Sequence, residues 1–165
     1  DINLSTIANN DVLQYNSTTG VWDNGTIDLT PVLFAIYKDT DSTTSDFPIS
    51  GWDAPTINIR GAWDNVGTYT VVLPGYYDLN FQAQMQTTAP NSQANFISLY
   101  VNGARVSFAN QLMVNVAGGD EYITMIVSRL IYLNSGDEVI TGCVVKNGGV
   151  LNNSHLKIIR VSPDI

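Results

Sequence analysis

The chain has 165 residues, of which 44% are hydrophobic and only 13% are charged, and its formal net charge is −8. Abundant hydrophobic residues exclude a disordered acidic chain, and the length is typical of one compact domain. The negative charge disfavours nucleic acid and anionic membranes as partners. No apolar run reaches the length of a membrane span, so we expect no membrane insertion. Because the chain begins at Asp1, we expect a fragment or a processed product.

The residue types favour strands over helices. The chain contains 13 Asp but 2 Glu, and only 3 Lys, whereas exposed helix faces are usually rich in Glu and Lys. Asp and Asn favour turns, and Val, Ile and Thr favour strands. The composition therefore predicts an all-β protein with helices nearly absent.

Residues 1–30 differ from the rest of the chain in their pattern of turn-forming and apolar residues. Turn-forming residues surround two very short apolar pairs, Val12-Leu13 and Val21-Trp22, which cannot form a core alone. We predict a short extended or hairpin segment, with Asn24-Gly25 as a plausible tight turn.

Longer strands begin at Pro31. The clearest pattern runs from Tyr77 to Gln86, where ten residues alternate strictly between apolar and hydrogen-bonding side chains. Two further strands meet at Asn102-Gly103, which is typical of a hairpin turn. About eight to ten antiparallel strands, separated by turns, predict a jelly-roll β-sandwich over residues 31–165.

The strand predicted over residues 121–133 is apolar on both faces. One face carries Tyr122, Ile126, Leu130 and Tyr132, whereas the other is rich in Ile, Met, Val and Leu. A two-layer sandwich buries only one face of an antiparallel strand. The second face therefore predicts a partner subunit.

Reactive chemistry is sparse. Cys143 lies in an apolar strand, where a free cysteine behaves as a small hydrophobic residue, and His155 has no nucleophile motif beside it. Asp39, Asp41 and Asp46 share a loop that could chelate calcium, but a solvated loop is favoured. We expect no catalytic residues, no metal site and no cofactor.

Trp52 stands in a polar loop, where a core role is less obvious than for Trp63. Exposed aromatic rings beside Asn, Asp and Gln are typical of sugar-binding sites. We therefore predict that Trp52 is exposed.

Several motifs together resemble the C1q/tumour necrosis factor (TNF)-like jelly roll. They are a Pro-Gly turn before a strand with Tyr-x-Phe character (Leu73-Pro74-Gly75-Tyr76-Tyr77-Asp78-Leu79-Asn80-Phe81), the turn Asn102-Gly103, and Leu133-Asn134-Ser135-Gly136-Asp137-Glu138-Val139. The first Phe of the family pattern is replaced by Leu79, and the common Phe-Ser-Gly ending is missing. The resemblance implies a homotrimer whose interface lies on the inner sheet, which would contain Tyr122, Ile126, Leu130, Tyr132, Gln82 and Gln84.

Residues 11–22 (Asp-Val-Leu-Gln-Tyr-Asn-Ser-Thr-Thr-Gly-Val-Trp) are similar to a short module of phage tail-fibre and other virion fibre proteins. Together the two resemblances imply a non-enzymatic trimeric fibre tip, extracellular on a virion, that binds a host-surface glycan or protein. The alternative is a trimerisation cap or a capsid decoration fibre without a ligand. Candidate contact loops are residues 38–52 and 87–95, and the candidate ligand-binding residues are Trp52, Asp53, Asp41, Asn91 and Gln93.

Overall fold

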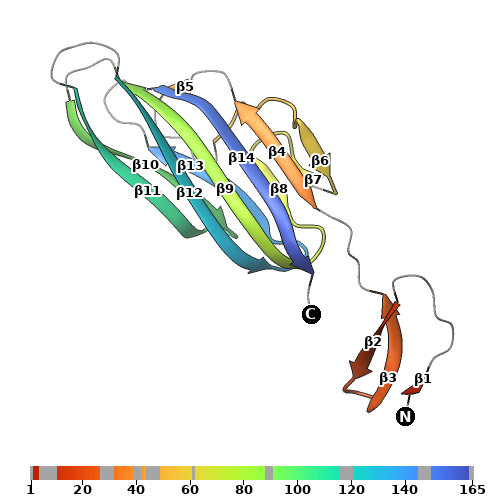
Figure 1. Ribbon diagram of the computed structural model, residues 1–165. Helices are drawn as coiled ribbons and strands as arrows, with labels where there is room; N and C mark the ends of the chain where they lie inside the picture. The colour runs from red at the N-terminus through yellow and green to blue at the C-terminus, as the bar shows by residue number, and fades with distance from the viewer. Residues whose placement is uncertain are drawn as a thin grey trace. The chain divides into compact units, whose positions relative to one another are not determined.

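The computed structural model of the chain describes residues 2–3, 11–26, 32–38, 42–43, 49–60, 62–87, 91–115, 121–144 and 150–163. Within these ranges every regular element is a β-strand and none is a helix (Figure 1). The all-β prediction is confirmed. The chain separates into two compact units, Asp1–Thr30 and Pro31–Ile165.

The first unit is a small sheet of three short strands in the order β1-β3-β2. Strand β2 (Asp11–Asn16) and strand β3 (Val21–Thr26) form an antiparallel hairpin, and β1 (Ile2–Asn3) pairs parallel to β3. The hairpin turn lies at residues 17–20, where Gly20 adopts a φ of 71°. Asn24-Gly25 lies inside β3, so the prediction of a tight turn there is wrong.

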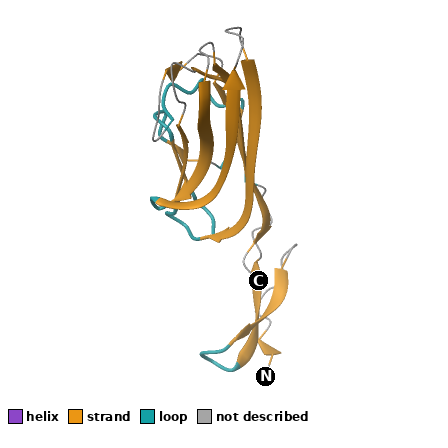
Figure 2. Ribbon diagram, turned by 90° about the vertical axis from the view of Figure 1, so that its left-hand side faces the viewer, coloured by secondary structure: helices purple, strands orange, loops and turns teal. Residues whose placement is uncertain are grey.

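The second unit is a sandwich of two antiparallel sheets, which Figure 2 shows as two layers. One sheet has the order β12-β9-β14-β4-β6, with β5 paired to β14, and the other has the order β11-β10-β13-β8-β7. The strands of the first sheet are β4 (Leu33–Lys38), β5 (Ser42–Thr43), β6 (Ile57–Ile59), β9 (Gly75–Thr87), β12 (Glu121–Leu133) and β14 (Val150–Pro163). The strands of the second sheet are β7 (Ala62–Trp63), β8 (Thr68–Thr70), β10 (Asn91–Val101), β11 (Ala104–Asn115) and β13 (Glu138–Val144).

Strand β9 shows why the sandwich forms. Its five alternate apolar residues are completely buried, whereas the polar residues between them are half-buried on the other face. Side chains of a strand alternate between faces, so this sequence directs one face of the first sheet to the core. The buried residues are Tyr77, Leu79, Phe81, Ala83 and Met85.

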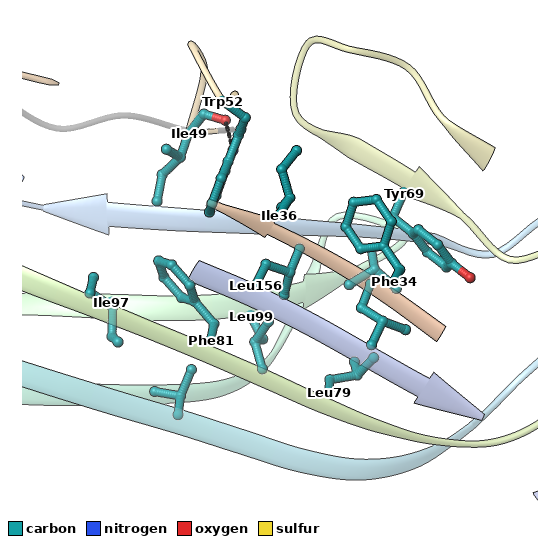
Figure 3. Packing of buried hydrophobic residues seen from close by; sticks show 14 of the residues in the cluster. Phe34, Ile36, Ile49, Trp52, Tyr69, Leu79, Phe81, Ile97, Leu99 and Leu156 are labelled. Atoms are coloured by element: carbon teal, nitrogen blue, oxygen red, sulfur yellow. Dashed lines mark hydrogen bonds between the residues drawn. The ribbon is translucent and has the colours of Figure 1, made fainter. Parts of the chain in front are cut away.

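The core between the sheets is built around aromatic rings (Figure 3). The Phe34 ring of β4 lies 5.0 Å from the Tyr69 ring of β8 and 5.2 Å from the Trp63 ring of β7, so it joins the two layers. Aromatic pairs at these distances add to the stability that burial alone provides. The same contacts confirm the expected core role of Trp63, which packs against this cluster.

Two strand boundaries depend on the backbone. Residues 57–63 form β6 and β7, which belong to different sheets, and Arg60 between them adopts a left-handed φ of 53°. Strand β11 continues without a break from Ala104 to Asn115. The predicted turn at Asn102-Gly103 is confirmed, with both φ angles positive (49° and 76°).

Candidate functional site

Strand β12 presents an apolar face that its own chain leaves open. Tyr122, Ile126 and Leu130 are 53%, 56% and 62% exposed, whereas Met125 and Val127 on the opposite face are each only 4% exposed. The sandwich covers only one face of this strand, and the partner subunit predicted to cover the other face stays a prediction. The exposed residues Thr124 and Ser128 lie between these apolar side chains on the same face. Large apolar side chains gathered on one exposed face mark a surface that a partner can cover.

The register of β12 against β9 places all six predicted interface residues on one face. Gln82 lies directly opposite Ile126, and Gln84 lies opposite Thr124, which alternates with Tyr122 and Ile126. Residues directly opposite each other in an antiparallel pair share a face. Both glutamines are half-buried, and the Gln84 Oε1 atom accepts a hydrogen bond of 3.2 Å from Asn153 Nδ2.

The predicted residue Tyr132 closes one end of this face. It lies opposite Tyr76 in the ladder, and the two rings meet nearly at right angles with their centroids 5.3 Å apart. Tyr76 is 46% exposed. The edge-to-face geometry fixes both rings and extends the apolar surface along β9 and β12.

The face continues across β14 and β4, which the sequence prediction missed. His155 lies opposite Gln82 on one side and Tyr37 on the other, and the Tyr37 and His155 ring centroids are 5.7 Å apart. Burial, and then the charge of Lys157, lower the pKa of His155 below its usual value. The useful signal was the strand register, which a single sequence does not provide. We call this surface, Tyr37, Tyr76, Gln82, Gln84, Tyr122, Ile126, Leu130, Tyr132 and His155, the open face.

Trp52 is buried, so the prediction that it is exposed is wrong. Its side chain is 9% exposed, and its Nε1 atom donates a hydrogen bond of 2.8 Å to the Ile49 carbonyl (Figure 3). The centroid of its ring lies 6.3 Å from those of Trp63 and Phe81. The segment around it runs beside β4, because Asp53 N donates to the Tyr37 carbonyl. Trp52 is therefore a core residue and offers no ring surface for a sugar to stack on.

The other predicted ligand-binding residues are not brought together by the described part of the chain. Asp53 is exposed. Asn91 and Gln93 lie in β10, opposite Asn115 and Met113, but their side chains lie outside the described residues, as does Asp41 entirely. Their role in ligand binding stays a prediction.

Lys38 is a buried charged residue that the sequence prediction did not single out. It is 4% exposed, and its Nζ atom donates hydrogen bonds to the carbonyls of Ser50 (2.6 Å) and Gly51 (3.2 Å). Gly51 has a φ of 68°, and a Cβ atom there would lie 2.9 Å from Nζ. Lys38 thus fastens the end of β4 to the segment that carries Trp52.

The described residues contain no group of three His, Cys, Asp or Glu side chains that could hold a metal ion. The one cysteine, Cys143 of β13, is buried in the hydrophobic core of the sandwich. Across the described ranges, no helix has the length and apolar character needed to cross a membrane. The open face is therefore the strongest candidate for function in the described structure, and its chemistry is that of a contact surface on which large apolar side chains alternate with polar ones.

The sequence matches no protein-family profile and no curated protein. The fold, however, resembles solved structures. An Eiger TNF from S. frugiperda is 13% identical, covers 81% of this chain and 96% of its own, and has a TM-score of 0.61. The globular domain of zebrafish complement 1qA protein is 12% identical over 81% of this chain and 99% of its own, with a TM-score of 0.58. Murine APRIL, from a crystal structure at pH 5.0, is 12% identical over 80% of this chain and 100% of its own, with a TM-score of 0.63. The chain thus has the C1q/TNF jelly-roll fold.

Proposed function

We propose that this chain is the non-enzymatic, homotrimeric head of a phage or virion fibre, extracellular on the virion, that binds a host cell-surface receptor, with a glycan as the favoured class. The observation that carries the homotrimer in this proposal is the open face, where Tyr122, Ile126 and Leu130 are each more than half exposed. Domains of the C1q/TNF fold typically form homotrimers, which supports a second and third copy of the chain as the cover.

Self-association through the open face is supported by the chemistry of that face and by the area that obligate interfaces bury. The residues that define the open face are aromatic, aliphatic or amide side chains apart from His155, but Asp78 lies opposite Leu130, and Thr124 and Ser128 alternate with the apolar residues of β12. Obligate interfaces bury on the order of 2,000 Å² or more. In a closed threefold ring, the open face of each subunit contacts both neighbouring subunits, so no open face remains uncovered. Trivalent display would then raise the avidity of weak individual receptor sites.

The fibre part of the proposal rests on the module-like residues 11–22, which precede the sandwich in the sequence. Receptor contact is assigned to the segments at residues 38–52 and 87–95 and to the adjacent, exposed Asp53, although residues 91–95 belong to β10 and not to a loop.

The first test is the mass of the intact chain in solution, which we expect to be three times 18.0 kDa. The second is binding of that trimer to a glycan array and to candidate host cells. A monomer at micromolar concentration would contradict the homotrimer, and a trimer that adsorbs to no host cell would contradict receptor binding.

A second candidate function is a structural trimerisation cap or a capsid decoration fibre without a ligand. It is favoured by the burial of Trp52, because this removes the aromatic platform expected for a sugar. Replacing exposed loop residues such as Asp53 distinguishes the two candidates. A cap would keep both assembly and adsorption by the rest of the fibre, whereas a receptor-binding head would lose adsorption alone.

A further inference from the structure

The small first unit carries an apolar face of its own. Leu13, Tyr15 and Trp22 are 48%, 55% and 44% exposed. Tyr15 lies directly opposite Trp22 in the hairpin, with ring centroids 5.4 Å apart, and Leu13 is two residues from Tyr15 on the same strand. The three side chains therefore share one face of the sheet, which we call the leader face.

This unit is too small to be stable by itself. Its strands have two to six residues, and its largest described side chains are about half in water. Isolated hairpins are marginally stable at best, and units of this size usually need a cross-link or an association to remain folded. The cover for the leader face must come from elsewhere.

We propose that the leader face is covered by the leader faces of two other copies of the same chain. This inference rests on the proposed homotrimer. The peptide bond between Thr30 and Pro31 joins each leader to a head, so assembly of three heads brings three leaders to an effective concentration in the millimolar range for a short linker. A tethered copy is thus present in large excess over any free partner.

The charge of the segment restricts the other candidates. Residues 1–30 contain four Asp and no Lys, Arg, Glu or His, which disfavours anionic lipid and nucleic acid as the cover. The three residues of the leader face are themselves uncharged, so apolar contact between copies buries no charge at its centre. A threefold arrangement lets each leader face contact both neighbours.

Amide hydrogen exchange of the intact chain tests the proposal, with the mass measured in parallel. In the trimer, the amides of β2 and β3 should be protected. The head variant Leu130→Asp keeps the leader sequence but opens the head interface, so protection of the leader amides should fall by about tenfold or more together with the mass. The double variant Y15S/W22S should lose the same protection while the protein stays trimeric.

Phe108→Ser is the matched control, because Phe108 is a 55% exposed aromatic residue of β11, outside both faces. It should change neither the mass nor the leader protection. Leader amides that are unprotected in both the trimer and the Leu130→Asp monomer would overturn the leader proposal and leave the homotrimer standing. Leader amides that are fully protected in both would also overturn the leader proposal. A monomeric wild-type chain would refute the proposed function itself.

Discussion

The Asn102 side-chain amide donates a hydrogen bond of 2.8 Å to a carboxylate oxygen of Asp137, 35 residues further along the chain. The Asn102 Oδ1 atom accepts a hydrogen bond from Glu138 N (2.9 Å), and the other Asp137 oxygen accepts one from Asn134 N (2.8 Å). Two turns that join different strand pairs are thus fastened to each other. The hydrogen bond from Asn102, and then that from the Asn134 backbone, hold the pKa of Asp137 below its usual value.

This pairing predicts energetic coupling between the two turns. Asn102→Gly removes the amide without straining the positive φ of that residue, and Asp137→Ala removes the carboxylate. Each variant should lower the free energy of unfolding by about 1 kcal/mol, and the double variant should lose less than the sum. Urea unfolding of the four proteins checks the cycle, and strictly additive losses would contradict the coupling.

The open face predicts a strong effect of charge. Leu130→Asp places a carboxylate at a side chain that is 62% exposed in the single chain but buried in the proposed trimer. The variant should fold, since its core is untouched, yet run as a monomer in light scattering, because burying an unpaired charge is costly. Phe108→Asp, on the other sheet, should remain trimeric. An unchanged mass for Leu130→Asp would place the interface elsewhere.

The position of Trp52 predicts a stability defect rather than a binding defect. Trp52→Ala leaves a cavity beside Trp63 and Phe81 and should lower the free energy of unfolding by about 3–5 kcal/mol. The milder Trp52→Phe should retain most of the stability and all receptor adsorption. Thermal unfolding and cell adsorption, measured on both variants, separate the two roles. Loss of adsorption in a stable Trp52→Phe protein would restore Trp52 as a ligand contact.

His155 predicts acid sensitivity. Burial and the nearby Lys157 lower the pKa of His155 below the reference value of 6.5, so the unfolded chain binds a proton more readily than the folded one. Its contribution to stability is therefore complete above pH 6.5 and is lost as the pH falls through the lowered pKa. The midpoint of thermal unfolding should decrease below pH 6.5.

His155→Gln is the control for that experiment, since the chain has one histidine and Gln cannot titrate. The variant should show a flatter dependence of the unfolding midpoint on pH between about 5 and 7. The groups that face His155 are the Tyr37 ring and the Gln82 amide. An identical slope in the variant would assign the acid sensitivity to another group.

Asp64 predicts a second, more acidic transition. Burial raises the pKa of Asp64, but the backbone N–H groups of Thr68, Gly67 and Val66 outweigh that effect and lower it to about 2. The stabilisation is therefore present above pH 3.8 and is lost as the pH falls towards 2. Asp64→Ala should cost about 1 kcal/mol at pH 7, because solvent screens this exposed carboxylate. Asp64→Asn should cost less at pH 7, and equal losses would contradict the role of charge.

The fold was predictable because its signals are local. Strict alternation from Tyr77 to Met85 defines a half-buried strand, and Asn102-Gly103 specifies a hairpin whose left-handed backbone few other residues adopt. The part of the open face that β9 and β12 contribute was predictable for the same reason. The two apolar faces of β12 are visible in the sequence, and the structure confirms that one of them is left uncovered by the chain.

The predictions that failed concern residues whose positions depend on contacts between distant segments of the chain. Trp52 sits among polar neighbours in the sequence, yet the core has room for its ring between Trp63 and Phe81, and the Ile49 carbonyl accepts its N–H. His155 and Tyr37 join the open face only through the pairing of β14 with β4. Neither the burial of Trp52 nor the pairing of His155 with Tyr37 can be predicted from neighbouring residues in the sequence, because side-chain burial depends on which strands become neighbours.

Burial of Cys143 has a practical consequence for measuring distances within the assembly. Maleimide and methanethiosulfonate reagents need an accessible thiolate, so the native protein should remain unlabelled without replacement of its own cysteine. A single engineered thiol at an exposed site such as Thr18 would then carry one spin probe per copy. Three equal inter-probe distances in pulsed electron resonance would reveal threefold symmetry directly.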